Sequence, residues 1–134
     1  MYFDILFLKN ITCDNFVKWG IDMIIKRDLY LNKLIERKHN GLIKVITGIR
    51  RCGKSFLLCK LFKNHLLSEG VKEDHIIELN FDDFENEEYQ DPKVTSPYLR
   101  GKVIDSDMYY FLLDEIQLLD KFEAVKWFIK ALQR

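Results

Sequence analysis

The sequence has few cysteines and histidines, and none has the spacing of a metal site or a disulfide framework. Its 134 residues include three Cys and three His. Cys13, Cys52 and Cys59 are odd in number and form no C-x-x-C pair, which predicts reduced thiols in a cytoplasmic protein. The histidines lack metal-ligand spacing, so we expect them to be ordinary surface or boundary residues.

The chain also has a formal net charge of zero, because its 21 Lys and Arg residues balance its 21 Asp and Glu residues. The charges are unevenly distributed: residues 1–72 carry 14 basic and 6 acidic residues, and residues 73–134 carry 7 and 15. A basic half and an acidic half are compatible with a ligand that is a polyanion and binds together with a metal cation. A DNA-binding surface would need a concentrated basic patch, so nucleic acid is not supported as a partner.

The chain has no internal repeat, no low-complexity tract and no uninterrupted apolar run long enough for a membrane span. Residues 1–20 begin apolar, but Asp4 interrupts them and no basic region precedes them, which argues against a signal peptide. Three alternatives remain for this segment: an added strand, a disordered leader, or sequence translated upstream of the usual start. Since Met23 begins a stretch that resembles a domain opening, we divide the chain into a leader of uncertain structure (1–22) and one domain portion (23–134).

What the sequence does contain is a phosphate-binding loop, the Walker A pattern. An apolar, β-branched run ends at Gly48, and after four residues Gly53, Lys54 and Ser55 open an amphipathic helix. Glycine permits the turn and the close approach of backbone N–H groups to phosphate oxygens. Lys54 is placed to reach the β- and γ-phosphates, and the Ser55 hydroxyl to bind Mg²⁺. The predicted nucleotide-binding residues are Gly48, Ile49, Arg50, Arg51, Cys52, Gly53, Lys54, Ser55 and Phe56.

A second chemical element follows 60 residues after Lys54. The run Met108–Leu113 is entirely apolar or aromatic, as in a strand buried on both faces of a parallel sheet, and it ends at Asp114 and Glu115. This is the Walker B pattern. Beside a phosphate loop, Asp114 would hold Mg²⁺ and Glu115 would polarise the attacking water.

The remaining pattern predicts an alternation of helices and strands. We expect a helix over 21–38, a strand over 42–47, a helix from Lys54 to about Ser68 and a strand over 75–81. The acidic segment from Asp82, which contains both prolines of the chain before Gly101, is expected to be a solvated loop. A last helix follows Asp120.

From Ile24 to Arg134 the pattern resembles the prokaryotic AAA-type ATPases that are described only as ATP-binding proteins and carry an appended C-terminal domain of unknown function. The matching segments are residues 26–28, 45–55, 79–83 and 111–117. The resemblance implies an α/β fold: a three-layer αβα P-loop NTPase, RecA-like, of the additional-strand, catalytic-glutamate type. It also implies ATP, Mg²⁺ and hydrolysis coupled to an unidentified motion or partner. Lys54, Ser55, Asp114 and Glu115 take the roles given above; Gln117 matches the pattern but receives no role.

The sequence departs from that family in its length. Only 19 residues follow Glu115, enough for one helix, so we expect a domain truncated after the Walker B strand. No strand is expected between 42–47 and 108–114, or on the far side of 42–47. The two motif strands could pair directly, or a partner chain, the remaining domain or residues 1–20 could supply a strand. The third outcome, a loosely folded chain with open sheet edges, is the one we expect for the chain alone.

Three functions compete on this evidence. The first is ATP binding with hydrolysis. The second is a small phosphotransferase, which would need a lid with arginines and an acceptor site, and the position of Glu115 argues against it. The third is a non-catalytic nucleotide-binding or truncated module.

Overall fold

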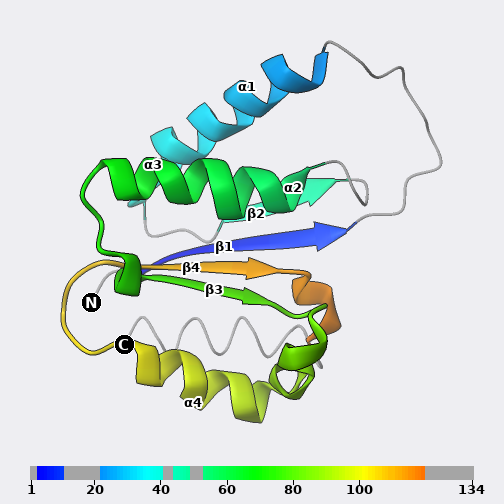
Figure 1. Ribbon diagram of the computed structural model, residues 1–134, viewed down its shortest axis with the longest axis vertical. Coiled ribbons are helices and arrows are strands. Elements are labelled where there is room, and N and C mark those ends of the chain that lie inside the picture. Colours follow the sequence, from blue (N-terminus) through cyan, green and yellow to red (C-terminus); the bar gives the residue numbers. More distant parts are fainter. Residues whose placement is uncertain (1–2, 11–21, 41–43, 49–52, 120–134) are drawn as a thin grey trace.

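The computed structural model describes residues 3–10, 22–40, 44–48 and 53–119 (Figure 1). The strands are β1 (Phe3–Asn10), β2 (Lys44–Gly48), β3 (Ile76–Asn80) and β4 (Tyr109–Asp114). The helices are α1 (Asp22–Arg37), α2 (Lys54–Phe56), α3 (Lys63–Ser68) and α4 (Pro92–Lys102). A π-helical stretch, η1 (Leu57–Phe62), joins α2 to α3, and 3-10 turns form η2 (Glu73–His75), η3 (Phe84–Gln90) and η4 (Ile116–Leu118).

The four described strands form one parallel sheet in the order β2-β1-β4-β3. All four arrows in Figure 1 point the same way, so the carboxyl ends of the strands meet at one edge. Asn10 is in register with Gly48, and Asn80 with Asp114. This edge is where parallel α/β sheets place their ligands.

The position of β1 corrects our expectation that no strand of this chain would separate the two motif strands. Phe3–Asn10 lies between β2 and β4 and pairs with both. Of the alternatives left open for residues 1–20, the structure therefore has the added strand. The sequence could not indicate this, because a parallel neighbour far away in the chain leaves no local signal.

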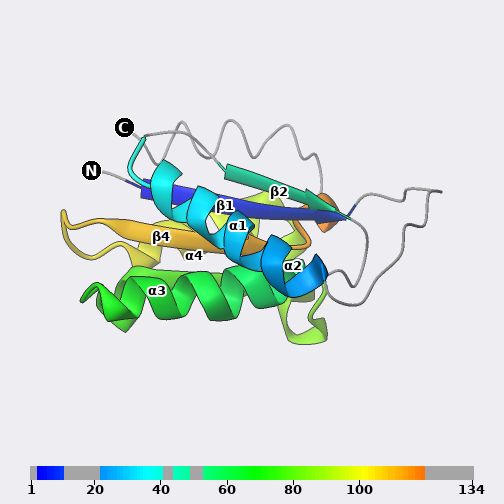
Figure 2. The same cartoon turned by 90° about the horizontal axis from the view of Figure 1, so that it is seen from above.

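Alternate residues of β4 contact opposite layers, which makes the fold three layers thick. Tyr110 and Leu112 belong to a core cluster with Leu34 of α1 and Phe62 of η1. Tyr109, Phe111 and Leu113 belong to the other cluster, which includes Leu99 of α4. Figure 1 shows α1 and α3 on one side of the sheet and α4 on the other, and in Figure 2 α1 crosses in front of the strands. The apolar run Tyr109–Leu113 of β4 is thus explained by burial on both faces.

The helix that begins at Lys54 ends where the sequence predicts. Gly70 has φ +90°, a left-handed conformation that glycine adopts without strain. The N–H of Val71 donates to the carbonyl of Leu66, and that of Gly70 to Leu67, the pairing of a Schellman cap. The predicted helix over 21–38 and the strands over 42–47 and 75–81 are likewise confirmed in their described parts.

The solvated loop expected from Asp82 to Gly101 is wrong, because this segment contains η3 and α4. The Asp91 carboxylate accepts from the N–H of Lys93, and Pro92 occupies the first helical turn, where its missing N–H costs nothing. The second proline, Pro97, stands inside α4, where it removes a backbone hydrogen-bond donor. The burial of Leu99 in the core beside the sheet outweighs its cost, and the buried Thr95 hydroxyl donates to the carbonyl of Tyr89.

The helix predicted after Asp120 lies outside the described residues. Among the helices that the structure does describe, none combines the length and the apolar character needed to cross a membrane.

Candidate functional site

The described part of the phosphate loop lies at the carboxyl edge of the sheet. Gly48 ends β2, and Gly53 stands directly before α2 with φ +87°. A side chain at Gly53 would strain this left-handed turn, which directs the chain from the loop into the helix. Positions 49–52, Ile49, Arg50, Arg51 and Cys52, lie outside the described residues. Lys54 is buried, with 8% of its surface exposed, whereas Phe56 is exposed.

The two predicted metal ligands are in contact. The Ser55 hydroxyl donates a hydrogen bond to the Asp114 carboxylate, and the charge of Lys54 acts on the same carboxylate. Burial raises the pKa of Asp114 above its usual value; the bond from Ser55 opposes this rise, and the neighbouring Glu115 charge adds to it. The structure thus brings Lys54 and Ser55 together with Asp114, about 60 positions later in the chain, and a cation would stabilise the Asp114 carboxylate.

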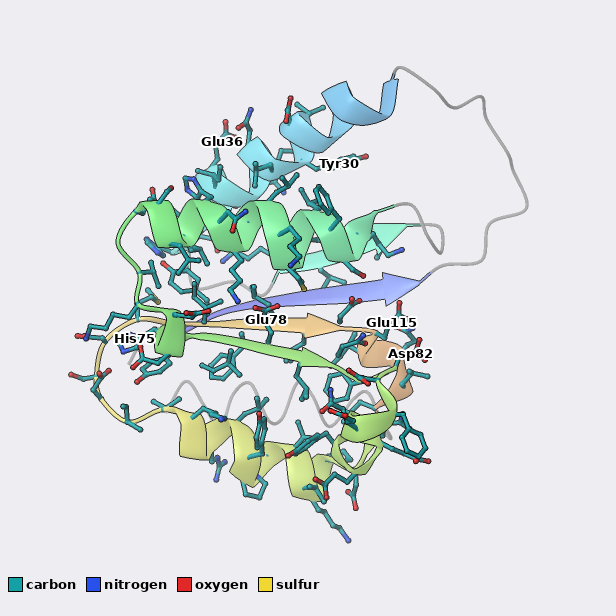
Figure 3. All side chains as sticks on the ribbon, viewed as in Figure 1. Tyr30, Glu36, His75, Glu78, Asp82 and Glu115 are labelled. Carbon is teal, nitrogen blue, oxygen red and sulfur yellow. The ribbon has the colours of Figure 1, made fainter. Side chains whose placement is uncertain are left out.

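Glu115 occupies a sharp turn immediately after β4. Its backbone is left-handed, with φ +56°, which is uncommon for a residue other than glycine. Its N–H donates to Oδ1 of Asp114 at 2.9 Å, and the Gln117 side-chain amide donates to its carboxylate. Figure 3 shows Glu115 at the carboxyl edge, with Asp82 beyond the end of β3 at the same edge. Backbone strain held by such contacts is frequent at functional sites.

Sequence reasoning missed two features of this edge. β1 brings its own carboxyl end, Asn10, beside Gly48, so a strand from the N-terminal segment borders the loop strand. Gln117 contacts Glu115, although the family pattern alone assigned it no role. The only local signal for this contact was that Gln117 follows Glu115 by two residues, just after the end of a strand.

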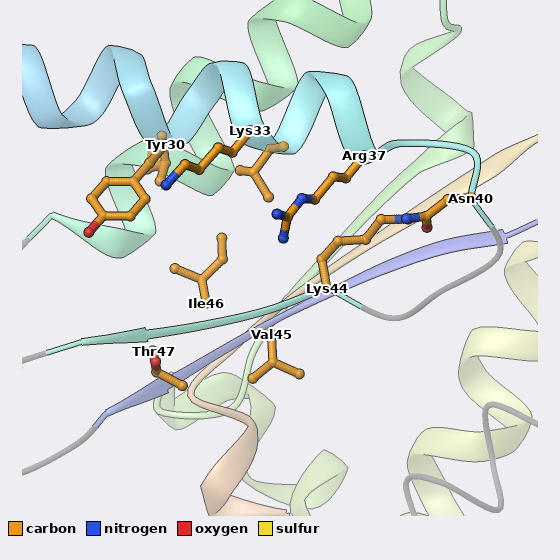
Figure 4. A pocket seen from close by; sticks show the side chains of 10 residues that line it. Tyr30, Lys33, Arg37, Asn40, Lys44, Val45, Ile46 and Thr47 are labelled. Carbon is orange, nitrogen blue, oxygen red and sulfur yellow. The ribbon is translucent and has the colours of Figure 1, made fainter.

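A cavity of about 490 Å³ lies between α1 and β2. Lys33 and Arg37 of α1 and Lys44 of β2 line it, together with the apolar side chains of Leu34 and Ile46 (Figure 4). Its ten described lining residues include no carboxylate. Positive charge from the basic half of the chain therefore gathers beside the strand that leads into the phosphate loop.

His75 is a buried residue at the opposite edge of the sheet, so its assignment to the surface or boundary was wrong. Its ring stacks on Tyr109 with centroids 4.3 Å apart, and its Nε2 lies 3.3 Å from Oδ2 of Asp105. Asp107 pairs with Lys72 at 3.6 Å. The backbone N–H of Asp107, and then the His75 charge, lower the pKa of Asp105. These contacts tie the loop before β4 to the start of β3, which is a structural role.

Cys59 should be chemically inert in the folded protein. Burial, helped by the carboxylates of Glu78 and Asp114, raises the pKa of its thiol to about 12. The thiolate, which is the reactive form, is therefore rare at pH 8. In a variant with Cys13→Ser and Cys52→Ser, mass spectrometry should detect no iodoacetamide adduct until denaturant is added. Labelling of the native protein at the denatured rate would contradict the burial of this thiol.

Comparison with known proteins agrees with this geometry. The chain is 36% identical over 103 residues to an uncharacterized protein of Haemophilus influenzae, an alignment that covers 76% of this chain and 26% of that protein. The chain therefore spans about a quarter of the length of that relative. No solved structure matches it. A family model described as "AAA domain" matches residues 40–133, which include the whole phosphate loop, Asp114 and Glu115, and the chain therefore belongs to the AAA domain family.

Proposed function

We propose that this chain binds ATP together with Mg²⁺ at the carboxyl edge of its sheet and hydrolyses it. The observation that carries the proposal is the hydrogen bond from Ser55 to Asp114, which joins the phosphate-loop helix to the carboxylate strand. A Ser hydroxyl and a carboxylate are oxygen ligands of the kind that Mg²⁺ prefers. Family membership supports an ATPase-like, nucleotide-binding function.

The residues present fit a nucleoside triphosphate with its metal. Lys54 is buried next to Asp114, and its position at the start of the phosphate-loop helix suits a contact with the β- and γ-phosphates. Ser55 and Asp114 would hold Mg²⁺, which when bound neutralises phosphate charge and polarises the phosphoryl group. The buried Asp114 carboxylate is costly to ionise alone, and a nearby cation would remove that cost.

Hydrolysis would depend on Glu115. Its carboxylate stands one residue past the metal-binding position, on a turn fixed by two hydrogen bonds. A carboxylate so placed can accept a proton from water as it attacks the phosphoryl group. A phosphotransferase would instead keep water away and bind a second substrate.

The proposed fold is the three-layer P-loop NTPase of the RecA-like, additional-strand type. The parallel sheet supports this, since one strand, β1, separates the loop strand β2 from the carboxylate strand β4. We further propose a cytoplasmic location and a protein partner, or a remaining part of a longer chain, to which hydrolysis is coupled. The alignment covers only 26% of the relative, so most of that protein lies outside the matched region, which agrees with such a part.

The substitution Lys54→Ala tests the nucleotide site. It deletes a buried charge from the phosphates, where charge-assisted contacts contribute about 1.5–3 kcal/mol, so the Kd for Mg-ATP should rise about 10- to 150-fold. Isothermal titration calorimetry measures this. Lys60→Ala, an exposed lysine on the same continuous helix, is the matched control and should leave the Kd unchanged.

An unchanged Kd in Lys54→Ala would contradict the phosphate-loop assignment. Stoichiometric binding of ATP without release of phosphate by the wild type would instead favour a non-catalytic nucleotide-binding module.

A further inference from the structure

Gln117 is held in a tight turn that directs its side chain back toward Glu115. The turn η4 follows Glu115 directly, and the N–H of Leu118 donates to the Glu115 carbonyl at 3.0 Å. Ile116 is fully buried between the two polar residues and anchors the turn in the core. The η4 turn also packs against β1. Gln117 therefore has little freedom to leave its position.

The contact between Gln117 and Glu115 has a defined direction. A carboxylate only accepts hydrogen bonds, so the amide nitrogen Nε2 of Gln117 must face Oε2 of Glu115. The amide oxygen Oε1 then points the other way. It is buried and, within the described part of the chain, has no hydrogen-bond partner. Leaving an acceptor unpaired is unfavourable, so stability alone does not explain a glutamine here.

We infer that Gln117 is a positioning residue, which orients the Glu115 carboxylate for proton abstraction from water. The inference rests on the hydrolysis proposed above. A general base works best when a third group fixes its orientation, as the base of a nucleophile–base pair is oriented in hydrolases. The amide of Gln117 binds one carboxylate oxygen of Glu115 and so restricts the rotation of the whole carboxylate. In this role Gln117 acts through its contact with Glu115.

The substitution Gln117→Leu removes the amide donor and the unpaired oxygen while keeping a similar volume. We expect the kcat for ATP hydrolysis to fall about 10- to 100-fold, because an unoriented base loses part of its catalytic effect. The Kd for Mg-ATP should stay within twofold of wild type, since Lys54, Ser55 and Asp114 are unchanged. The matched control is Gln90→Leu: Gln90 is also half-buried and donates from its Nε2, to the Phe81 carbonyl at 2.9 Å, so kcat should not change.

Two further measurements separate positioning from a general structural role. Gln117→Glu keeps the size of the side chain but replaces the donor with an acceptor beside Glu115, so its kcat should fall at least as far. In ¹⁵N-labelled wild type, the side-chain amide resonance of Gln117, assigned by its absence in Gln117→Leu, should shift when Glu115 is changed to Ala. This change in chemical shift detects the contact between Gln117 and Glu115 independently of ATP hydrolysis.

The outcomes distinguish this inference from the proposed function. Wild type that releases no phosphate contradicts the proposed hydrolysis, and the inference falls with it. Wild type that hydrolyses ATP while Gln117→Leu and Gln117→Glu keep the wild-type kcat contradicts the inference alone. An unshifted Gln117 amide resonance in Glu115→Ala also contradicts it. If Gln117→Leu does not fold, the resonance is assigned by its absence in Gln117→Glu.

Discussion

A variant without residues 1–22 should show no cooperative melting transition and should bind no ATP. These residues contain β1, which pairs five residues with β2 and five with β4. No other described strand touches β2. Deleting β1 therefore separates the strand that leads into the phosphate loop from the strand that carries Asp114.

The size of the effect follows from the hydrogen bonds that β1 makes. Each backbone bond contributes about 0.5–1.5 kcal/mol net, and each buried group left unpaired costs about 1–3 kcal/mol. All six residues of β4 are buried, so water cannot replace the lost partners without opening the core. Since whole domains are stable by only about 5–15 kcal/mol, the loss of two ladders exceeds what the fold can absorb.

Leu6→Pro is a sharper form of the same experiment. Leu6 is in register with both Lys44 and Leu112, and proline removes a backbone N–H from the middle of a central strand. The control is Lys72→Pro at an exposed residue whose φ of −66° already suits proline. Circular dichroism should record a lost or strongly lowered transition for Leu6→Pro only. Unchanged melting of the variant without residues 1–22 would show that β2 and β4 can pair directly.

The second large effect is expected at Glu115. Glu115→Gln keeps the side chain's size but removes the carboxylate that accepts the proton, so turnover should fall about 10²- to 10⁴-fold while Mg-ATP binding is retained. Phosphate release and calorimetry measure the two quantities on one preparation. Glu87→Gln, at an exposed glutamate of η3, should leave both unchanged. Turnover of Glu115→Gln close to wild type would remove Glu115 from the reaction.

Asp114→Asn should behave differently, because this residue is expected to bind the metal. The Mg²⁺ dependence of ATP binding should be lost, with ATP binding in EDTA little affected. Equal behaviour of Asp114→Asn and Glu115→Gln would contradict the division of roles between these two residues.

The pKa of Asp114 gives this comparison a pH signature. Burial raises the folded-state pKa above the usual value, so the folded protein binds this proton more tightly than the unfolded chain does. The ionised Asp114 carboxylate therefore destabilises the folded protein at neutral pH. This destabilisation disappears as the pH falls through the raised pKa. Without nucleotide, Asp114→Asn should melt at a higher temperature at pH 7. The gain should shrink on acidification.

Local patterns sufficed for the helix from Lys54 to Ser68 and for singling out Ser55 and Asp114, which the structure brings together. A glycine-flanked loop between a strand and a helix needs particular residues at fixed spacing, so its chemistry is visible in the sequence. The α4 helix was missed for the opposite reason. Asp91 and Pro92 are helix-start signals, but the stability of α4 comes from the burial of Leu99 against a sheet that no local pattern reveals.

The amino-acid sequence by itself determined the phosphate loop, the carboxylates of Asp114 and Glu115, and the strands that carry them, because each depends on neighbours along the chain. Only the tertiary structure decided that Phe3–Asn10 separates those strands and that Gln117 contacts Glu115. Parallel pairing joins segments far apart in sequence, and its energy lies in backbone bonds common to all residues. A side-chain contact across a turn likewise depends on backbone angles, here the left-handed Glu115, that the residue types do not specify.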